Sequence, residues 1–226
     1  KKYLTKKFRV FNEKIFVIPT GLNEKRFPRI GTKNTEGEYT PMVIFRGKNN
    51  PESDMNLLAK ISHLLPKECN LVVITDKINN IDKFSINTEF HIGNVSDRLI
   101  ENFYSKATLA IGQLAKSPRI QNTIPHKAFE AAYFGIPYIS QESSAMRELF
   151  PLDSQVIYLK TIDVENLAQE INLLVKRKKL NKSYREAFKR QYELVCSQKL
   201  LKSKLVKESI GTNGSIQHTS EWMVQK

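Results

Sequence analysis

The sequence has few of the residues that form covalent or metal cross-links. Its 226 residues include two cysteines, Cys69 and Cys196, and four scattered histidines. Two cysteines give no disulfide framework, and no group of cysteines and histidines has the spacing of a zinc site. We therefore expect no metal and no other cofactor, and a reducing, cytoplasmic compartment is the default expectation.

Long apolar runs are lacking as well. No stretch approaches the roughly 20 apolar residues that a membrane-spanning helix needs, and we expect no secretory signal. The sequence begins with Lys1 and not with Met, so we expect it to be an excerpt of a longer protein. Hydrophobic residues make up 40% and charged residues 26%, which is typical of a globular protein.

Positive charge is in excess and is unevenly spread. The formal net charge is +13, and the stretch from Lys176 to Arg190 holds eight basic residues and one acidic residue. Such a stretch suits an anionic membrane surface or nucleic acid, but it also fits a solvated helix face. The interleaved aromatic and basic residues of single-strand binders are absent, so we expect no nucleic-acid partner and retain the membrane surface.

Apolar strand patterns alternate with helical patterns from Pro41 onward. Strands are predicted at residues 42–45, 71–74, 89–92, 108–111, 137–140 and 156–159, with a further short strand at 15–18. Helices are predicted at 52–65, about 97–107, 125–134, 143–150 and 163–178, followed by one or two basic helices to about residue 209. This alternation predicts an α/β fold, a Rossmann-like parallel sheet with helices on both faces. Ligands of such sheets bind beyond the carboxyl ends of the strands.

The most informative stretch runs from residue 119 to residue 140. Pro125 suits the first turn of a helix, and Gly135 supplies the positive φ that ends it. Lys127 and Glu130 are three residues apart on one face of the first turn. A helix N-terminus favours anions, and a carboxylate accepts hydrogen bonds from vicinal hydroxyls, so this pattern suits a sugar phosphate or a nucleotide. The alternative is a solvated surface pair.

The segment PHKAFEAAYFGIPYIS resembles the P-x-K-x-x-E-A-x-x-x-G-x-P-x-I segment of the glycosyl transferases group 1 family. The resemblance implies a retaining enzyme of the GT-B fold, with two Rossmann-like domains and a nucleotide-sugar donor. It also implies that Glu130 holds the donor's ribose hydroxyls. It covers roughly residues 14–200, the C-terminal, donor-binding half of such an enzyme. The acceptor-binding N-terminal domain has no counterpart, so we expect this chain to bind donor without turning it over.

Two further turns carry the resemblance. Arg46, Gly47 and Lys48 follow the first strand and resemble the family's G-R turn, which grips the donor phosphates. Lys48 falls on the arginine position, whereas the family's second cation is missing, because Ser53 and Asp54 stand there. Arg46 or Lys127 would then have to supply the missing second cation. The alternative interpretation is an ordinary basic turn.

The second turn, Gly93-Asn94-Val95, resembles the family's F-x-G-x-V-S turn, whose backbone meets the nucleobase. A plain cap between a strand and a helix is the alternative. Thr123 stands where many members carry an additional glutamate, which predicts a different presentation of the donor sugar. We assign no catalytic residue and no metal ligand. The predicted binding residues are Arg46, Gly47, Lys48, Gly93, Asn94, Val95, Pro125, Lys127 and Glu130.

Together these features predict four segments: an interdomain segment at 1–28, a nucleotide-sugar-binding domain at 29–195, a C-terminal helix at 196–210 and a disordered tail at 211–226. The predicted function is that of a hexosyltransferase-type glycosyltransferase acting on a glycan or lipid-linked acceptor, peripheral on the cytoplasmic membrane face. Two alternatives stay open: a non-enzymatic Rossmann-type module that binds an anionic membrane or nucleic acid, and another GT-B enzyme such as a sugar-nucleotide epimerase.

Overall fold

The fold is built on one sheet of six parallel strands. The computed structural model describes residues 6–9, 20–27, 40–150, 156–159, 163–176 and 182–210. The strands lie in the order β3-β2-β1-β4-β5-β6. Their bounds are Met42–Arg46 (β1), Asn70–Thr75 (β2), Thr88–Ile92 (β3), Leu109–Ile111 (β4), Tyr138–Gln141 (β5) and Val156–Leu159 (β6). This is the predicted fold class, and the strand order reverses between β1 and β4.

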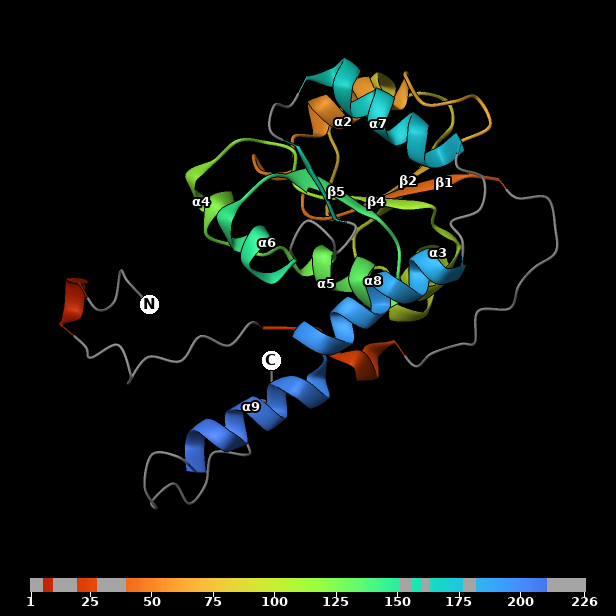
Figure 1. Ribbon diagram of the computed structural model, residues 1–226. Coiled ribbons are helices and arrows are strands. Elements are labelled where there is room, and N and C mark those ends of the chain that lie inside the picture. The colour runs from red at the N-terminus through yellow and green to blue at the C-terminus, as the bar shows by residue number, and fades with distance from the viewer. Residues whose placement is uncertain are drawn as a thin grey trace.

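Helices cover both faces of this sheet. Figure 1 shows α2 (Met55–Ser62) and α7 (Val164–Lys176) on one face, and α3 (Asp97–Lys106), α5 (His126–Phe134) and α8 (Lys182–Val195) on the other. The remaining helical elements are η2 (Glu24–Arg26), η3 (Ile81–Lys83), α4 (Pro118–Gln121), α6 (Ser144–Leu149) and α9 (Gln198–Ile210). Each face carries a hydrophobic core of its own. The central strands are accordingly buried on both sides, as in β1, where Val43, Ile44 and Phe45 are fully buried.

Local signals account for most element boundaries. Ser96 is the N-cap of α3 and its side chain accepts from the Leu99 N–H. Gly135 ends α5 with a φ of 65°, as predicted. The helix expected over 52–65 is shorter, because Asp54 caps it and Met55 is its first residue. The helix α4 was not predicted, because its four residues are too few for a periodic pattern, although Ser117 is its cap and Pro118 stands in its first turn.

Several sequence predictions lie outside the described residues. They include the short strand at 15–18 and the tail at 211–226. Residues 20–27 of the N-terminal region pack against α5 and α8. Phe27 is fully buried, Tyr133 donates a hydrogen bond to its carbonyl at 2.9 Å, and Tyr192 donates to Glu24 Oε1 at 2.9 Å. This segment therefore belongs structurally with the Rossmann-like sheet.

Candidate functional site

Three of the predicted binding residues meet where the strand order reverses. Arg46 is the last residue of β1, and Lys127 and Glu130 lie in the first turns of α5, which follows β4 in the chain. The carboxyl ends of the neighbouring strands β1 and β4, where the strand order reverses, are the place where doubly wound sheets bind their ligands. The topology thus brings together residues that are 84 positions apart in the sequence.

Glu130 is held by two partners in this cluster. Its side chain is 3% exposed and forms an ion pair with Arg46, whose own side chain is 25% exposed. The Tyr104 hydroxyl donates a hydrogen bond to the other carboxylate oxygen at 2.9 Å. Burial, together with the nearby Glu130 charge, raises the pKa of Tyr104 well above its ordinary value, so this hydroxyl stays a donor. The solvated surface pair considered from the sequence is therefore wrong: both Lys127 and Glu130 are buried.

Lys127 has a different environment. The residue is 8% exposed, and its ammonium has no hydrogen-bond partner among the described residues. The Nζ atom lies 4.3 Å from the centroid of the Phe45 ring, a cation–π contact. Burial lowers the pKa of Lys127 to about 7, and the nearby Glu130 charge opposes this shift. A buried ammonium at a helix N-terminus, without a bonded counter-ion, is suited to receive an anion.

Because Gly47 has no side chain, the space beside it is open to the end of the Lys127 side chain. A Cβ atom at this position would lie 2.8 Å from Lys127 Nζ, closer than real contacts allow. The next residue, Lys48, is exposed, and its carbonyl accepts a hydrogen bond from Ser53 Oγ at 2.7 Å. Ser53 and Asp54, which stand where the family has its second cation, have structural roles: Ser53 bonds within this loop and Asp54 caps α2. Lys127 is therefore the buried cation beside Gly47.

The remaining predicted residues lie at the margin of this cluster. Gly93 ends β3, two strands from β1, with its N–H bonded to the Thr75 carbonyl at 2.9 Å. Asn94 is exposed and Val95 packs against the core shared with α5. Pro125 was expected inside the first turn of the helix, but it is the extended N-cap residue, and α5 begins at His126. The nucleobase contact of Gly93, Asn94 and Val95 stays a prediction.

Sequence reasoning missed two residues of the site, Tyr104 and Phe45. Both occur in apolar patterns, Tyr104 on the inner face of α3 and Phe45 inside β1, and were assigned to the core. A buried tyrosine hydroxyl needs a partner, which was the available signal for Tyr104. Its partner comes from another helix, and a local pattern does not identify such a contact.

The described residues were predicted to hold no metal, and a basic stretch was predicted to face a membrane. No group of three or more histidine, cysteine, aspartate or glutamate side chains in the described ranges could hold a metal ion. Within the same ranges, no helix has the length and apolar character needed to cross a bilayer. In the basic stretch from Lys176 to Arg190, Arg185 donates to the Ala107 carbonyl at 2.9 Å and so joins α8 to the end of α3.

The fold of this chain is similar to that of several solved glycosyltransferase structures. The glycosyltransferase from Rickettsia africae is 16% identical, with a TM-score of 0.69, over 94% of this chain and 62% of its own. WaaG, a glycosyltransferase involved in lipopolysaccharide biosynthesis, is 15% identical, with a TM-score of 0.65, over 93% of this chain and 60% of its own. HepE from Anabaena, in complex with UDP-glucose, is 11% identical, with a TM-score of 0.61, over 75% of this chain and 48% of its own.

This chain has the Rossmann-like GT-B fold. It spans between 48% and 62% of the length of these three GT-B structures. No protein-family model matches the sequence, so membership of the glycosyl transferases group 1 family stays a prediction. No curated protein matches the sequence either. The GT-B fold therefore rests on the structure, and the roles of the clustered residues rest on their chemistry.

Proposed function

We propose that this chain is the donor-binding half of a glycosyltransferase, which binds a nucleotide-sugar for transfer, with retained configuration, to a glycan or lipid-linked acceptor. The observation that carries the proposal is the buried ammonium of Lys127, without a hydrogen-bond partner among the described residues, at the N-terminus of α5 and beside Gly47. The GT-B fold and the ligand of HepE, UDP-glucose, support a nucleotide-sugar as the anion.

The diphosphate of such a donor would complete the environment of Lys127. Among the described residues this ammonium lies over the Phe45 ring at the N-terminal end of α5 and feels the charges of Glu130 and Arg46, but it has no hydrogen-bond partner. A diphosphate at Gly47 would form a charge-assisted hydrogen bond with Nζ and would meet the exposed Lys48 from the other side. Lys127 thus supplies the second phosphate cation that Ser53 and Asp54 do not provide.

Glu130 has capacity left for the ribose. A carboxylate offers about four acceptor positions, and Arg46 and Tyr104 use one each. Arg46 is the more exposed member of the ion pair, so it lies between Glu130 and solvent. We expect Arg46 to turn from Glu130 toward the diphosphate when donor binds, while Tyr104 keeps the carboxylate oriented. The ribose hydroxyls would then bond to the side of Glu130 that Arg46 leaves.

Catalysis in the whole enzyme would rest on positioning and on electrostatic stabilisation of the leaving diphosphate. This chain contributes Arg46, Lys48 and Lys127 to that stabilisation. The acceptor and the residues that bind it belong to the other domain in this proposal. The basic stretch of α8 would face an anionic membrane surface on which lipid-linked acceptors lie.

The test is calorimetric titration of the chain with UDP, GDP, ADP and the corresponding glucose nucleotides. One nucleotide should bind saturably, and Lys127→Met should weaken it by about ten- to a hundredfold, the cost of one charge-assisted hydrogen bond. Glu130→Gln should weaken the nucleotide but should not weaken the binding of inorganic pyrophosphate, because Arg46 no longer has to leave a carboxylate. This difference separates the ribose contact from the phosphate contact.

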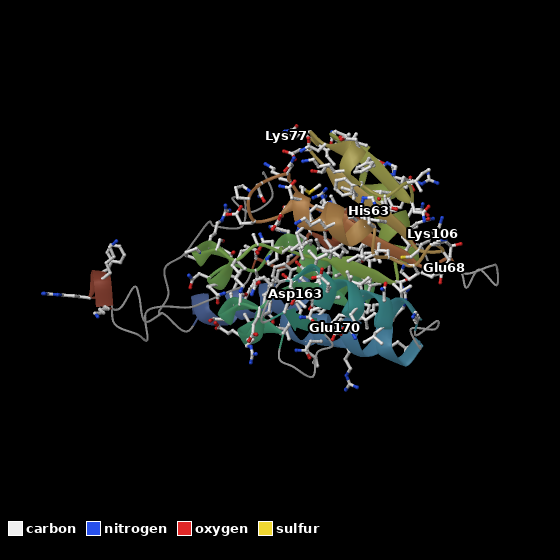
Figure 2. The ribbon with its side chains drawn as sticks, turned by 90° about the horizontal axis from the view of Figure 1, so that it is seen from above. His63, Glu68, Lys77, Lys106, Asp163 and Glu170 are labelled. Carbon is white, nitrogen blue, oxygen red and sulfur yellow. The ribbon has the colours of Figure 1, made fainter. Side chains whose placement is uncertain are left out.

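Lys106→Met is the matched control, because it also removes one lysine charge. Figure 2 shows Lys106 near Glu68, on the side of the molecule where β2 and β4 begin. Lys77, which follows the carboxyl end of β2, lies away from them. The control should bind nucleotide as the unaltered chain does. Equal affinity of Lys127→Met and the unaltered chain, in a folded variant, would refute the proposed role of the cluster.

A further inference from the structure

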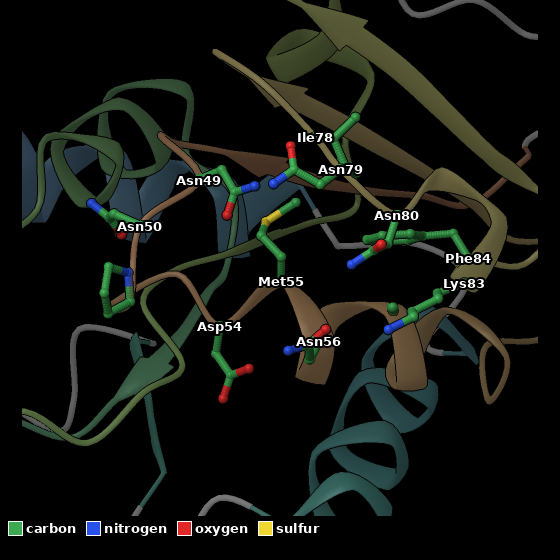
Figure 3. Close-up of a pocket in the computed structure, with 12 residues that line it drawn as sticks. Asn49, Asn50, Asp54, Met55, Asn56, Ile78, Asn79, Asn80, Lys83 and Phe84 are labelled. Carbon is green, nitrogen blue, oxygen red and sulfur yellow. The ribbon is translucent and has the colours of Figure 1, made fainter.

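A cavity lies at the carboxyl edge of the sheet, on the face that carries α2. Its volume is about 380 Å³, within the range of roughly 300–1,000 Å³ that small-molecule sites occupy. The loop after β1, the start of α2 and the loop after β2 form its walls (Figure 3). None of its lining residues belongs to the Arg46, Lys127 and Glu130 cluster. The cavity is therefore a separate feature of the molecule.

Asparagine amides dominate the polar part of the lining. Asn49, Asn50, Asn56, Asn79 and Asn80 all contribute to it. Figure 3 shows Asn49 and Asn79 pointing toward one another from different loops, next to Met55. Within the described ranges, the Asn49, Asn56, Asn79 and Asn80 side chains make no hydrogen bond, whereas the Asn50 carbonyl oxygen accepts from Ser53. Each unbonded amide offers two donors and one acceptor.

The other lining residues are mostly apolar, and the two charged residues among them have opposite charges. Met55, Ala59, Ile78 and Phe84 form the apolar part, and Asp54 and Lys83 carry opposite charges. The phosphate cluster around Lys127 is different, because its unbonded group is a buried cation. Amides beside apolar carbon suit a neutral ligand that has hydroxyl groups on its edges and C–H groups on its faces. A saccharide has this chemistry, whereas an anion would find one exposed lysine and a repelling carboxylate.

We propose that this cavity is a saccharide-binding site, distinct from the proposed donor site on the other face of the sheet. Asn49 and Asn79 would bond to the hydroxyls of one sugar unit from both sides, and Met55 and Phe84 would pack against its C–H face. The Asp54 carboxylate caps α2 through Oδ1 and points away from Asn49 and Asn79 (Figure 3), so it takes no part in this contact. The loop after β1 separates the two sites, so a glycan held here would lie beside bound donor.

The experiment is NMR titration of the full chain with D-glucose, N-acetyl-D-glucosamine and maltotriose. The side-chain amide signals of the asparagines report directly on the proposed contacts. At least one saccharide should shift the Asn49 and Asn79 signals saturably, with a dissociation constant in the millimolar range. The double variant Asn49→Ala, Asn79→Ala should weaken that binding by about tenfold, because two neutral hydrogen bonds are lost.

Asn102→Ala is the matched control, since it removes an exposed asparagine of α3, far from the cavity in the sequence. It should bind the saccharide as the unaltered chain does. The double variant should keep its affinity for nucleotide, so that failure here and failure of the proposed donor function are told apart. Absence of saturable shifts at Asn49 and Asn79 with all three saccharides would overturn the proposal, as would equal binding by the double variant.

Discussion

At the scale of single residues, Lys127 links stability to pH. Its pKa is about 7 in the folded chain and has an ordinary value of 10.5 when exposed. The unfolded chain therefore binds more protons than the folded chain between these values, and the free energy of unfolding should rise with pH across this window. Lys127→Met should remove this part of the rise. Urea unfolding of both proteins at about pH 7 and about pH 10 measures it.

The same unfolding measurements on Lys106→Met give the comparison for a solvent-exposed lysine. This variant should keep the pH dependence of the unaltered chain. Identical slopes in Lys127→Met and the unaltered chain would mean that Lys127 is not a buried, partnerless cation in solution.

A second prediction for single residues compares two buried tyrosines. The Tyr104 hydroxyl donates to a carboxylate at 2.9 Å, and the Tyr133 hydroxyl donates to a carbonyl at the same distance. Hydrogen bonds to charged groups contribute about 1.5–3 kcal/mol, and neutral ones about 0.5–1.5 kcal/mol. Tyr104→Phe should therefore lower the free energy of unfolding by more than Tyr133→Phe does. Denaturant unfolding of both variants tests this, and the reverse order would contradict the charge on Glu130.

At the scale of secondary structure, most elements could be predicted, whereas the contacts of the site could not. Strand and helix patterns, Ser96 and Gly135 are local signals, and all six strands of the sheet were expected close to where they occur. The pairing of Arg46 with Glu130 depends on the order of strands in the sheet, which no local pattern contains. The resemblance named Glu130 for the ribose and placed Lys48 on the phosphate-binding position, and Arg46 entered only as a residue that could compensate for the missing cation, so nothing indicated that Arg46 pairs with Glu130.

The join between α5 and α8 depends on Gly135. A Cβ atom there would lie 2.4 Å from the Arg185 carbonyl oxygen, and φ is +65°. Gly93 has a φ of +87°, but a Cβ atom there would meet nothing within 4 Å. Gly93→Ala should therefore cost about 1 kcal/mol for backbone strain alone, whereas Gly135→Ala should cost about 1–3 kcal/mol more because α8 must move. Thermal and urea unfolding compare them, and equal costs would argue against close packing of these helices.

At the scale of the whole molecule, residues 20–27 join the sheet domain to its last helices. Gly21 approaches the Cys196 carbonyl and the Leu201 side chain, while Leu22, Phe27, Tyr192 and Cys196 belong to the core that α5 shares. Residues 20–27 and α8 therefore share one hydrophobic core, although 168 positions separate Glu24 from Tyr192. Such a core predicts that the N-terminal segment and α8 unfold together with the sheet.

Phe27→Ala tests this cooperativity. Phe27 is fully buried and its ring contacts those of Tyr133 and Phe134, so its truncation should lower the free energy of unfolding by about 3–5 kcal/mol. Phe8→Ala is the matched control, because Phe8 is 59% exposed, and it should cost no more than about 0.5 kcal/mol. Hydrogen exchange followed by mass spectrometry should show faster exchange in α8 and in the sheet for Phe27→Ala alone. Faster exchange confined to residues 20–27 would mean that this segment unfolds independently of the sheet and α8. It would then not be part of the hydrophobic core that the sheet and α8 share.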